Sequence, residues 1–313
     1  MKKAVLIPII IGGVLLTVGG AFLTIGLVNN ATAKLEEKTF EVSGNYKNFK
    51  IDLDTSDVTF IPSEDGLTKV VVKERAKQHH NVKVENEVLI IDYVNERTWF
   101  ENIFVNNDGL KVDVYVPANT YENLEIKSDT GEISIPSKFG FSSLDINVHT
   151  GNVYLECNVF DDANIVASTG NINYNYATLN NLEVTTSTGN MNFSKIKVAD
   201  YIKTNSSTGK LNLEEVKAKE LDLKLNTGDI TIVDTLVAGK VNIEASTGDV
   251  TIKNSDAESL KIKTSTGDVN ATLLTSKIVY AKSGTGKIDV PVSTTGGLCE
   301  IETSTGNITV KFE

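Results

Sequence analysis

The feature that most constrains this chain is the dipeptide Thr-Gly, which recurs at intervals of 19 or 20 residues. Its glycines are Gly131, Gly151, Gly170, Gly189, Gly209, Gly228, Gly248, Gly267, Gly286 and Gly306. An earlier copy at residues 54–57 reads Asp-Thr-Ser-Asp, with Ser56 in the place of the glycine. A fixed period of this length indicates stacked structural repeats.

Apolar and polar residues alternate on both sides of each Thr-Gly. Counted from the glycine, positions −7, −5, −3, +2 and +4 are the apolar or small ones, as in Leu260, Ile262, Thr264, Val269 and Ala271. Alternation of period two before and after a turn predicts two half-buried strands per repeat. We expect the glycine to be the third residue of a type II turn, where φ must be positive.

A further apolar residue at +7 or +8 predicts a short third side to each repeat. Examples are Ile196, Val216, Leu236 and Leu274. A repeat of this length is too short for a propeller blade and lacks the helix of leucine-rich repeats. We therefore predict an all-β fold, a parallel β-solenoid (β-helix) of about 11 coils, stacked about 4.8 Å apart.

The chain divides into four parts on this pattern. Residues 1–33 form a membrane anchor or signal segment, and residues 34–60 a linker and the first coil. Residues 61–120 interrupt the repeat as a β-hairpin insertion or cap, and residues 121–313 form the solenoid.

The insertion contains an aromatic segment with Trp99, Phe100 and Phe104. These side chains either pack as part of a cap on the open N-terminal end of the solenoid or contact a partner or a membrane. The last coil has no comparable cover. Its edge, residues 301–312, is therefore expected to be the site of any self-association.

The N-terminal segment predicts the location of the protein. Residues 4–28 contain no charge and would form a helix of about 37 Å, enough to span a membrane. Lys2 and Lys3 precede it, which favours a single-pass protein of the cell membrane with a cytoplasmic N-terminus and an extracytoplasmic body. The alternative is a secreted protein cleaved at Ala33, since Ala31-Thr32-Ala33 fits a signal-peptidase site.

Composition excludes some partners and pairings. The net charge of −11 argues against nucleic acid, which requires a basic surface. Cys157 and Cys299 lie seven repeats apart at core positions, so we expect two buried thiols and no disulfide.

The residues that follow the glycines are the best candidates for metal ligands. Asp229, Asp249 and Asp268 follow consecutive glycines and would form a column of oxygen atoms that could attract Ca²⁺. The Gly-rich nonapeptide of calcium-binding β-rolls is missing, and Asp and Asn are common in solvated turns. We expect no metal and no cofactor.

Catalytic residues are not predicted either, because no serine or threonine has an evident histidine partner. The alternative is an enzyme that acts on cell-wall polysaccharide. It would use residues such as Lys203, Asp222 and Lys224, together with Lys210 and Asp229, on neighbouring coils.

The turns Ser-Thr-Gly-Asp-Val at 246–250 and 265–269, preceded by Leu-x-Ile strands, resemble the bacterial "putative adhesin" β-strand-repeat family, whose function is unknown. The resemblance covers residues 39–313. It implies association with the cell envelope, in some members envelope-stress signalling, and it offers no catalytic residues. We therefore expect a non-catalytic binding or scaffold protein, adhesin-like or an envelope-stress accessory, with an envelope protein or glycan as partner.

Overall fold

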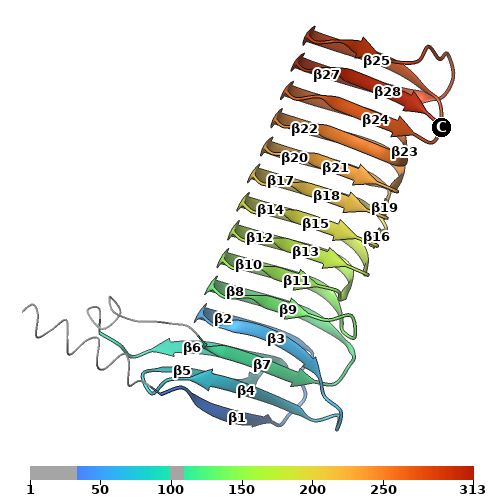
Figure 1. The fold of residues 1–313 in the computed structure, drawn as a ribbon. Helices are drawn as coiled ribbons and strands as arrows, with labels where there is room; N and C mark the ends of the chain where they lie inside the picture. The colour runs from blue at the N-terminus through green and yellow to red at the C-terminus, as the bar shows by residue number, and fades with distance from the viewer. Residues whose placement is uncertain (1–33, 99–108) are drawn as a thin grey trace, which may run out of the picture.

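The computed structural model describes residues 34–98 and 109–313, and within these ranges every regular element is a β-strand. The strands form a long column with a smaller group of strands at its N-terminal end (Figure 1). No helix in the described ranges is long and apolar enough to cross a membrane. The predicted anchor at residues 4–28 lies outside the described residues, as do Trp99, Phe100 and Phe104.

Each repeat contributes a long strand that ends at the threonine and a short strand that follows the glycine. Parallel pairing joins the long strands in one sheet and the short strands in another. The long strands are β2 (Asn48–Thr55), β8 (Thr120–Thr130), β10 (Gly140–Thr150), β12 (Asn158–Thr169), β14 (Thr178–Thr188), β17 (Tyr201–Thr208), β20 (Glu220–Thr227), β22 (Leu236–Thr247), β23 (Val250–Thr266), β25 (Lys277–Thr285) and β27 (Gly297–Thr305). The short strands are β3 (Asp57–Pro62), β9 (Ile133–Ile135), β11 (Val153–Leu155), β13 (Ile172–Asn175), β15 (Met191–Ser194), β18 (Leu211–Glu214), β21 (Ile230–Val233), the start of β23, β24 (Val269–Leu273), β26 (Ile288–Asp289) and β28 (Ile308–Phe312).

The predicted parallel β-solenoid is confirmed, with about ten turns. Equivalent residues of successive repeats are in register, so that Thr247 lies opposite Thr227 on one side and Thr266 on the other. The alternating apolar residues face inward: Ile243 and Ile262 are fully buried and adjacent in the stack. Burying an isoleucine or leucine side chain contributes about 1.5–3 kcal/mol, and each coil repeats this contribution.

The Thr-Gly turn has a different backbone conformation from the one that the sequence predicts. The ten glycines have φ between 130° and 153°, whereas the third residue of a type II turn has φ near about 80°. The type II prediction is therefore wrong, although the positive φ is present. At Gly248 a Cβ atom would lie 1.9 Å from the carbonyl oxygen of Gly228 in the preceding coil. The glycine thus permits both the backbone conformation and the coil spacing.

A second corner follows each short strand in the middle of the column. Its residue has a left-handed conformation without being glycine, with φ of 45–56° at Tyr176, Lys195, Glu215, Asp234 and Asn254. The chain then forms the third side, made of β16 (Lys197–Val198), β19 (Lys217–Ala218), the start of β22 and the middle of β23. Ile196 and Val216 are buried there, whereas Leu236 and Leu274 are exposed.

The N-terminal module consists of β1 (Glu36–Val42), β4 (Thr68–Glu74), β5 (Gln78–Glu85), β6 (Val88–Asn95) and β7 (Lys111–Val116). Strands β6 and β7 run parallel to β2 and β3 and so continue the stack by one layer. Strands β5, β4 and β1 are antiparallel to their neighbours. The insertion is therefore only partly made of hairpins, and its antiparallel strands end the parallel stack.

The C-terminal end is threaded out of sequence order (Figure 1). Strand β27 lies between β23 and β25, and β28 lies between β24 and β26. After β24 the chain leaves space for one coil and forms β25 and β26 beyond it. It then returns, and β27 and β28 fill that space. Residues 301–312 were predicted to be the open edge, and this is wrong for most of the segment. Residues 301–305 and 308–309 are paired on both sides, whereas residues 310–312 pair with β24 alone. The exposed edge belongs to β25 and β26, which we call the end coil.

Candidate functional site

The residue after each glycine forms a ladder between coils. Its side-chain Oδ1 accepts the backbone N–H of the equivalent residue in the next coil, as in Asp268 N to Asp249 Oδ1 at 2.8 Å and Asn190 N to Asn171 Oδ1 at 2.9 Å. All eight Asp or Asn residues at this position accept such a bond. They are Asp57, Asn152, Asn171, Asn190, Asp229, Asp249, Asp268 and Asn307.

This ladder, the Asx ladder, gives the column of Asp229, Asp249 and Asp268 a structural role. One oxygen of each carboxylate is directed at the backbone of its neighbour. Among the described residues no group of three or more His, Cys, Asp or Glu side chains is arranged to hold a metal ion. Because the bond is made through Oδ1 in every case, the ladder depends on the short Asx side chain.

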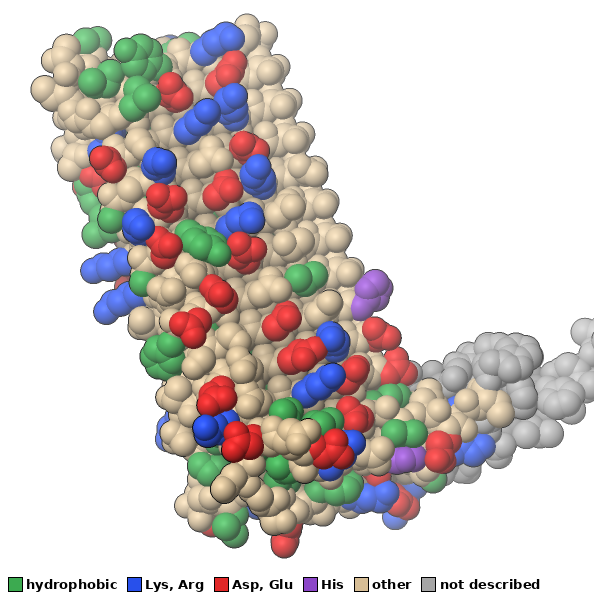
Figure 2. Space-filling model, turned by 180° about the vertical axis from the view of Figure 1, so that it is seen from behind, with side chains coloured by type: hydrophobic (Ala, Val, Ile, Leu, Met, Phe, Trp, Pro, Cys, Tyr) green, Lys and Arg blue, Asp and Glu red, His purple; other side chains and the backbone are tan. Residues whose placement is uncertain are grey.

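The charged residues considered for catalysis are distributed as pairs between coils. Lys203 lies 3.5 Å from Glu183, Lys224 lies 3.1 Å from Glu244, and Lys210 lies 3.2 Å from Asp229. Figure 2 shows positive and negative side chains mixed along the face drawn there. Each of these lysines is paired with an acidic residue of a neighbouring coil.

One histidine does have a serine partner, which the sequence alone did not reveal. His80 Nε2 lies 3.1 Å from Ser56 Oγ, and His80 Nδ1 lies 3.3 Å from a carboxylate oxygen of Glu74. Lys38 bonds the other oxygen of Glu74. Ser56 takes the place of glycine in the first repeat, between β2 and β3. Strands β1, β4 and β5 and the first turn of the solenoid thus meet at one polar network.

This network has the serine, histidine and carboxylate of a hydrolase triad, but it is not accessible to a substrate. Ser56, His80 and Glu74 are at most 2% exposed, and the Ser56 hydroxyl lies 2.6 Å from the carbonyl oxygen of Thr55. Burial lowers the pKa of His80 below its usual 6.5, although Glu74 acts in the opposite direction. Burial raises the pKa of Glu74, but hydrogen bonds from Lys38 and His80 outweigh it and bring the pKa below 4.5. The geometry joins the N-terminal module to the first coil.

A recess of about 660 Å³ lies where the module meets the solenoid. Its acidic residues come from three strands: Asp92 of β6, Asp52 and Asp54 of β2, and Asp129 of β8. Burial and the neighbouring Asp129 raise the pKa of Asp54 above its usual 3.8. This recess accumulates negative charge.

A second recess, the side groove, lies on the third side of the solenoid and has a volume of about 700 Å³. Its floor consists of the small inward residues Ala218, Val237 and Ala257, which lie on successive coils. The outward residues Lys217, Leu236 and Asp256 are stacked in register along it. Alanine at two of the three floor positions, in place of a larger side chain, leaves the hollow.

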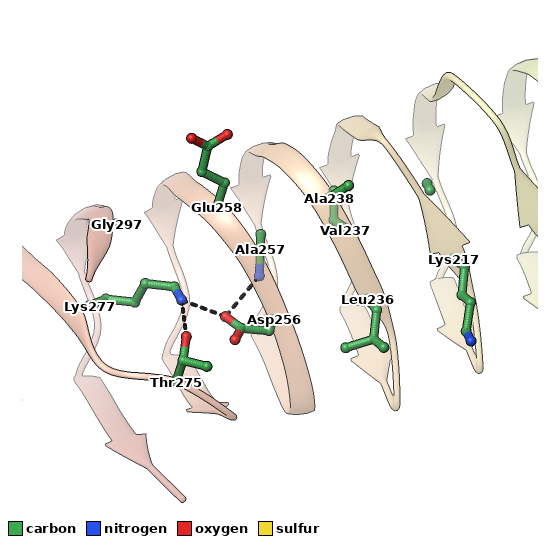
Figure 3. A pocket seen from close by; sticks show the side chains of 11 residues that line it. Lys217, Leu236, Val237, Ala238, Asp256, Ala257, Glu258, Thr275, Lys277 and Gly297 are labelled. Carbon is green, nitrogen blue, oxygen red and sulfur yellow. Dashed lines mark hydrogen bonds and ion pairs between the residues drawn. The ribbon is translucent and has the colours of Figure 1, made fainter.

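The C-terminal end of the side groove is closed by a buried ion pair (Figure 3). Lys277 Nζ lies 2.6 Å from Asp256 Oδ1 and also bonds Thr275 Oγ1, and its side chain is 4% exposed. Burial raises the pKa of Asp256, but hydrogen bonds from Lys277, Thr275 and the Ala257 amide outweigh it and bring the pKa below 3.8. The groove therefore combines an apolar floor and an exposed Leu236 with polar groups at both ends.

The two cysteines lie inside the column and line neither recess. Cys157 and Cys299 are free and buried. Burial raises the pKa of the Cys157 thiol to about 12 and that of Cys299 to about 11. Neither thiol is available for chemistry at neutral pH.

Two regions of the chain match one protein family. A family model described as Toastrack DUF4097 matches residues 46–253 and 233–313. No curated protein matches the chain.

Several solved structures are similar to this chain, among them the following three. A "putative adhesin" from Bacteroides fragilis is 14% identical, with 90% of this chain and 98% of that chain covered and a TM-score of 0.39. A "putative adhesin" from Parabacteroides distasonis is 15% identical, with 86% and 98% covered and a TM-score of 0.38. A "putative cell adhesion protein" from Clostridium sporogenes is 10% identical, with 90% and 100% covered and a TM-score of 0.24.

Proposed function

The chain belongs to the Toastrack DUF4097 family, and on that premise we propose that it is a non-catalytic binding and scaffold protein of the bacterial cell envelope. Residues 4–28 anchor it in the cell membrane, and the solenoid extends outside the cytoplasm. The side groove receives a segment of an envelope protein or glycan, as expected of an adhesin-like module or of an accessory to envelope-stress signalling.

The side groove is the observation that carries this proposal. It lies across consecutive coils whose positions are fixed by parallel pairing and by the Asx ladder. Leu236 is 44% exposed above a floor of small residues, a combination suited to contact with an extended partner. The ion pair of Lys277 and Asp256 gives the end of the groove two charged groups of opposite sign for a polar partner to contact.

Labelling of intact cells tests the placement. We would express the full chain with Leu236→Cys and add a membrane-impermeant maleimide. Cys157 and Cys299 should not react, because both are buried and their thiol pKa values are raised. The expected result is equal labelling before and after permeabilisation. Labelling only after permeabilisation would contradict an extracytoplasmic body.

Photo-crosslinking tests the groove. A photoreactive residue at position 236 should give a discrete adduct in intact cells, and one at position 154 should not. Tyr154 is a matched control, because it is 39% exposed but lies on the short-strand sheet. The assignment of the groove would be wrong if the two positions gave the same pattern.

A chemical assay tests the absence of catalysis. Cell-wall polysaccharide incubated with the purified full chain should gain no new reducing or unsaturated ends. Cleavage that disappears on Asp256→Asn or Glu74→Gln would instead establish a glycan-acting enzyme.

A further inference from the structure

The end coil leaves the interior of the solenoid open. Ile288 occupies position +2 and is 42% exposed, whereas the equivalent Val269 and Ile308 are fully buried. Val279 and Ala281 are only partly buried, although they continue the inward file of Leu260 and Ile262. These residues are exposed because no described strand stacks on their outer side.

The backbone of the end coil is unpaired on the same side. Among the described strands, β25 pairs only with β27 and β26 pairs only with β28. In the other coils of the solenoid, stacking on a neighbouring coil pairs these N–H and C=O groups and covers the apolar surface beside them. In the end coil both are left free on one side. The surface is therefore complementary to another coil of the same kind.

We propose that two copies of this chain pair head to head through their end coils, with β25 antiparallel to β25 of the second copy. The sequence of β25 fits this pairing. When the strand is centred on Ala281, Tyr280 of each copy lies opposite Lys282 of the other, and Val279 lies opposite Ser283. Tyr280 is 64% exposed, and Lys282 already balances its charge against Glu302 at 3.1 Å. A lysine placed over a tyrosine ring is favourable, and no like charges lie directly opposite each other in this register.

The opposite end of the molecule explains why the assembly stops at two copies. The N-terminal module ends in strands antiparallel to their neighbours, so the parallel stack does not present a second open coil among the described strands. Pairing of two end coils about a two-fold axis gives a closed dimer, not a fibre. The pair is a rod of twice the length, with an N-terminal module at each end.

This inference deepens the proposed function. The pairing itself does not depend on the proposed function, but its role in joining cells does. If the solenoid extends away from the membrane, a head-to-head pair joins molecules anchored in two facing cells. The partner of the adhesin-like module is then a second copy of the same chain.

Disulfide trapping tests the pairing. The purified full chain in detergent micelles, carrying Ala281→Cys, is oxidised and run without reductant. Directly opposed residues of antiparallel strands have Cα atoms about 4.5–5.5 Å apart, within the range for a disulfide. We expect most of the protein to migrate as a dimer. Leu236→Cys, on the side of the column, should give at least about tenfold less cross-linked dimer. This control excludes association through the membrane segment.

A matched pair of lysine substitutions completes the test. Ile288→Lys added to Ala281→Cys should reduce the cross-linked dimer at least about tenfold, whereas Leu236→Lys should not, although the two sites are 42% and 44% exposed. Thermal melting confirms that both variants fold. Absence of a cross-linked dimer in Ala281→Cys, or a dimer insensitive to Ile288→Lys, would overturn the proposal. Because the assay uses purified protein, it fails or succeeds independently of the cell-labelling test.

Discussion

At Gly248 both the backbone conformation and the close spacing of the coils require glycine. Its φ is +136°, and a Cβ atom would meet the Gly228 carbonyl oxygen at 1.9 Å. The period of the glycines could be predicted from the sequence, but the contact with the preceding coil could not, because it joins residues one whole repeat apart. Gly296 and Gly297 likewise permit close backbone contact where β27 enters between β23 and β25. A Cβ atom there would lie 1.8 Å from Ser276 O and 1.7 Å from Glu258 O.

Replacing one of these glycines should therefore cost more than backbone strain alone. We expect Gly248→Ala to lower the free energy of unfolding by about 3 kcal/mol or more, because strain and overpacking add. Gly66→Ala is the control, since Gly66 has φ of +74° but nothing within 4 Å of the added atom. Its cost should be about 1 kcal/mol. Thermal denaturation of the full chain measures both, and equal losses would show that the coil contact does not matter.

The His80 network makes the N-terminal module sensitive to acid. The His80 pKa is lowered in the folded state, so folding favours the neutral ring, and this contribution is lost as the pH falls below 6.5. The Glu74 pKa is also lowered, so a second contribution is lost below pH 4.5. The protection of β1, β4 and β5 against hydrogen exchange, measured relative to an unfolded peptide at the same pH, should therefore fall in acid before that of β17 and β20.

A histidine substitution separates these contributions. His80→Gln should remove the loss of protection that begins below pH 6.5 while leaving the one below pH 4.5. His149→Gln, at an exposed histidine on β10, should leave the whole profile unchanged. An unchanged profile in His80→Gln would mean that another group controls the module.

At the scale of the strand and its turn, the Asx ladder adds one hydrogen bond to the pairing of the sheets at each of the eight repeats that have Asp or Asn after the turn. The sequence predicted Asp and Asn at this position and left two interpretations, a solvated turn and a calcium column. The structure shows a third arrangement, in which Oδ1 accepts a backbone N–H of the next coil. That use could not be inferred from one repeat, because donor and acceptor belong to different coils.

Substitution of Asp249 tests the ladder. Asp249→Ala removes the acceptor for the Asp268 amide and should destabilise the chain by about 1 kcal/mol. Asp249→Asn keeps the acceptor and removes one of three neighbouring like charges, so it should be neutral or slightly stabilising at low salt. Thermal melting with and without millimolar CaCl₂ measures both variants. A calcium-dependent stabilisation of wild type that Asp249→Asn abolishes would restore the metal interpretation.

At the scale of the whole molecule, the threading of the last coils makes the C-terminus an internal part of the stack. β27 and β28 separate the end coil from the rest of the column. Local patterns cannot distinguish this order from a sequential one, since each repeat presents the same alternation and the same turn. The two glycines at the start of β27 are the local sign of the tight entry.

Truncation tests the threading. A stop after Gly296 removes β27 and β28 and should release β25 and β26 as well, because their pairing partners are lost. Hydrogen exchange at residues 277–289 should become as fast as in an unfolded peptide, while residues 121–266 keep their protection. A sequential stack would instead leave residues 277–289 protected.

The sequence by itself determined the coil: its length, its two strands, its inward residues and the place of its glycine follow from alternation and turn chemistry within about twenty residues. The tertiary structure alone decided which coils touch, and with it the Ser56–His80–Glu74 network, the side groove and the exposed end coil. The physical reason is that all coils offer nearly the same row of hydrogen bonds and the same apolar surface. Their local pattern specifies a kind of neighbour, and only the path of the folded chain specifies which neighbour it is.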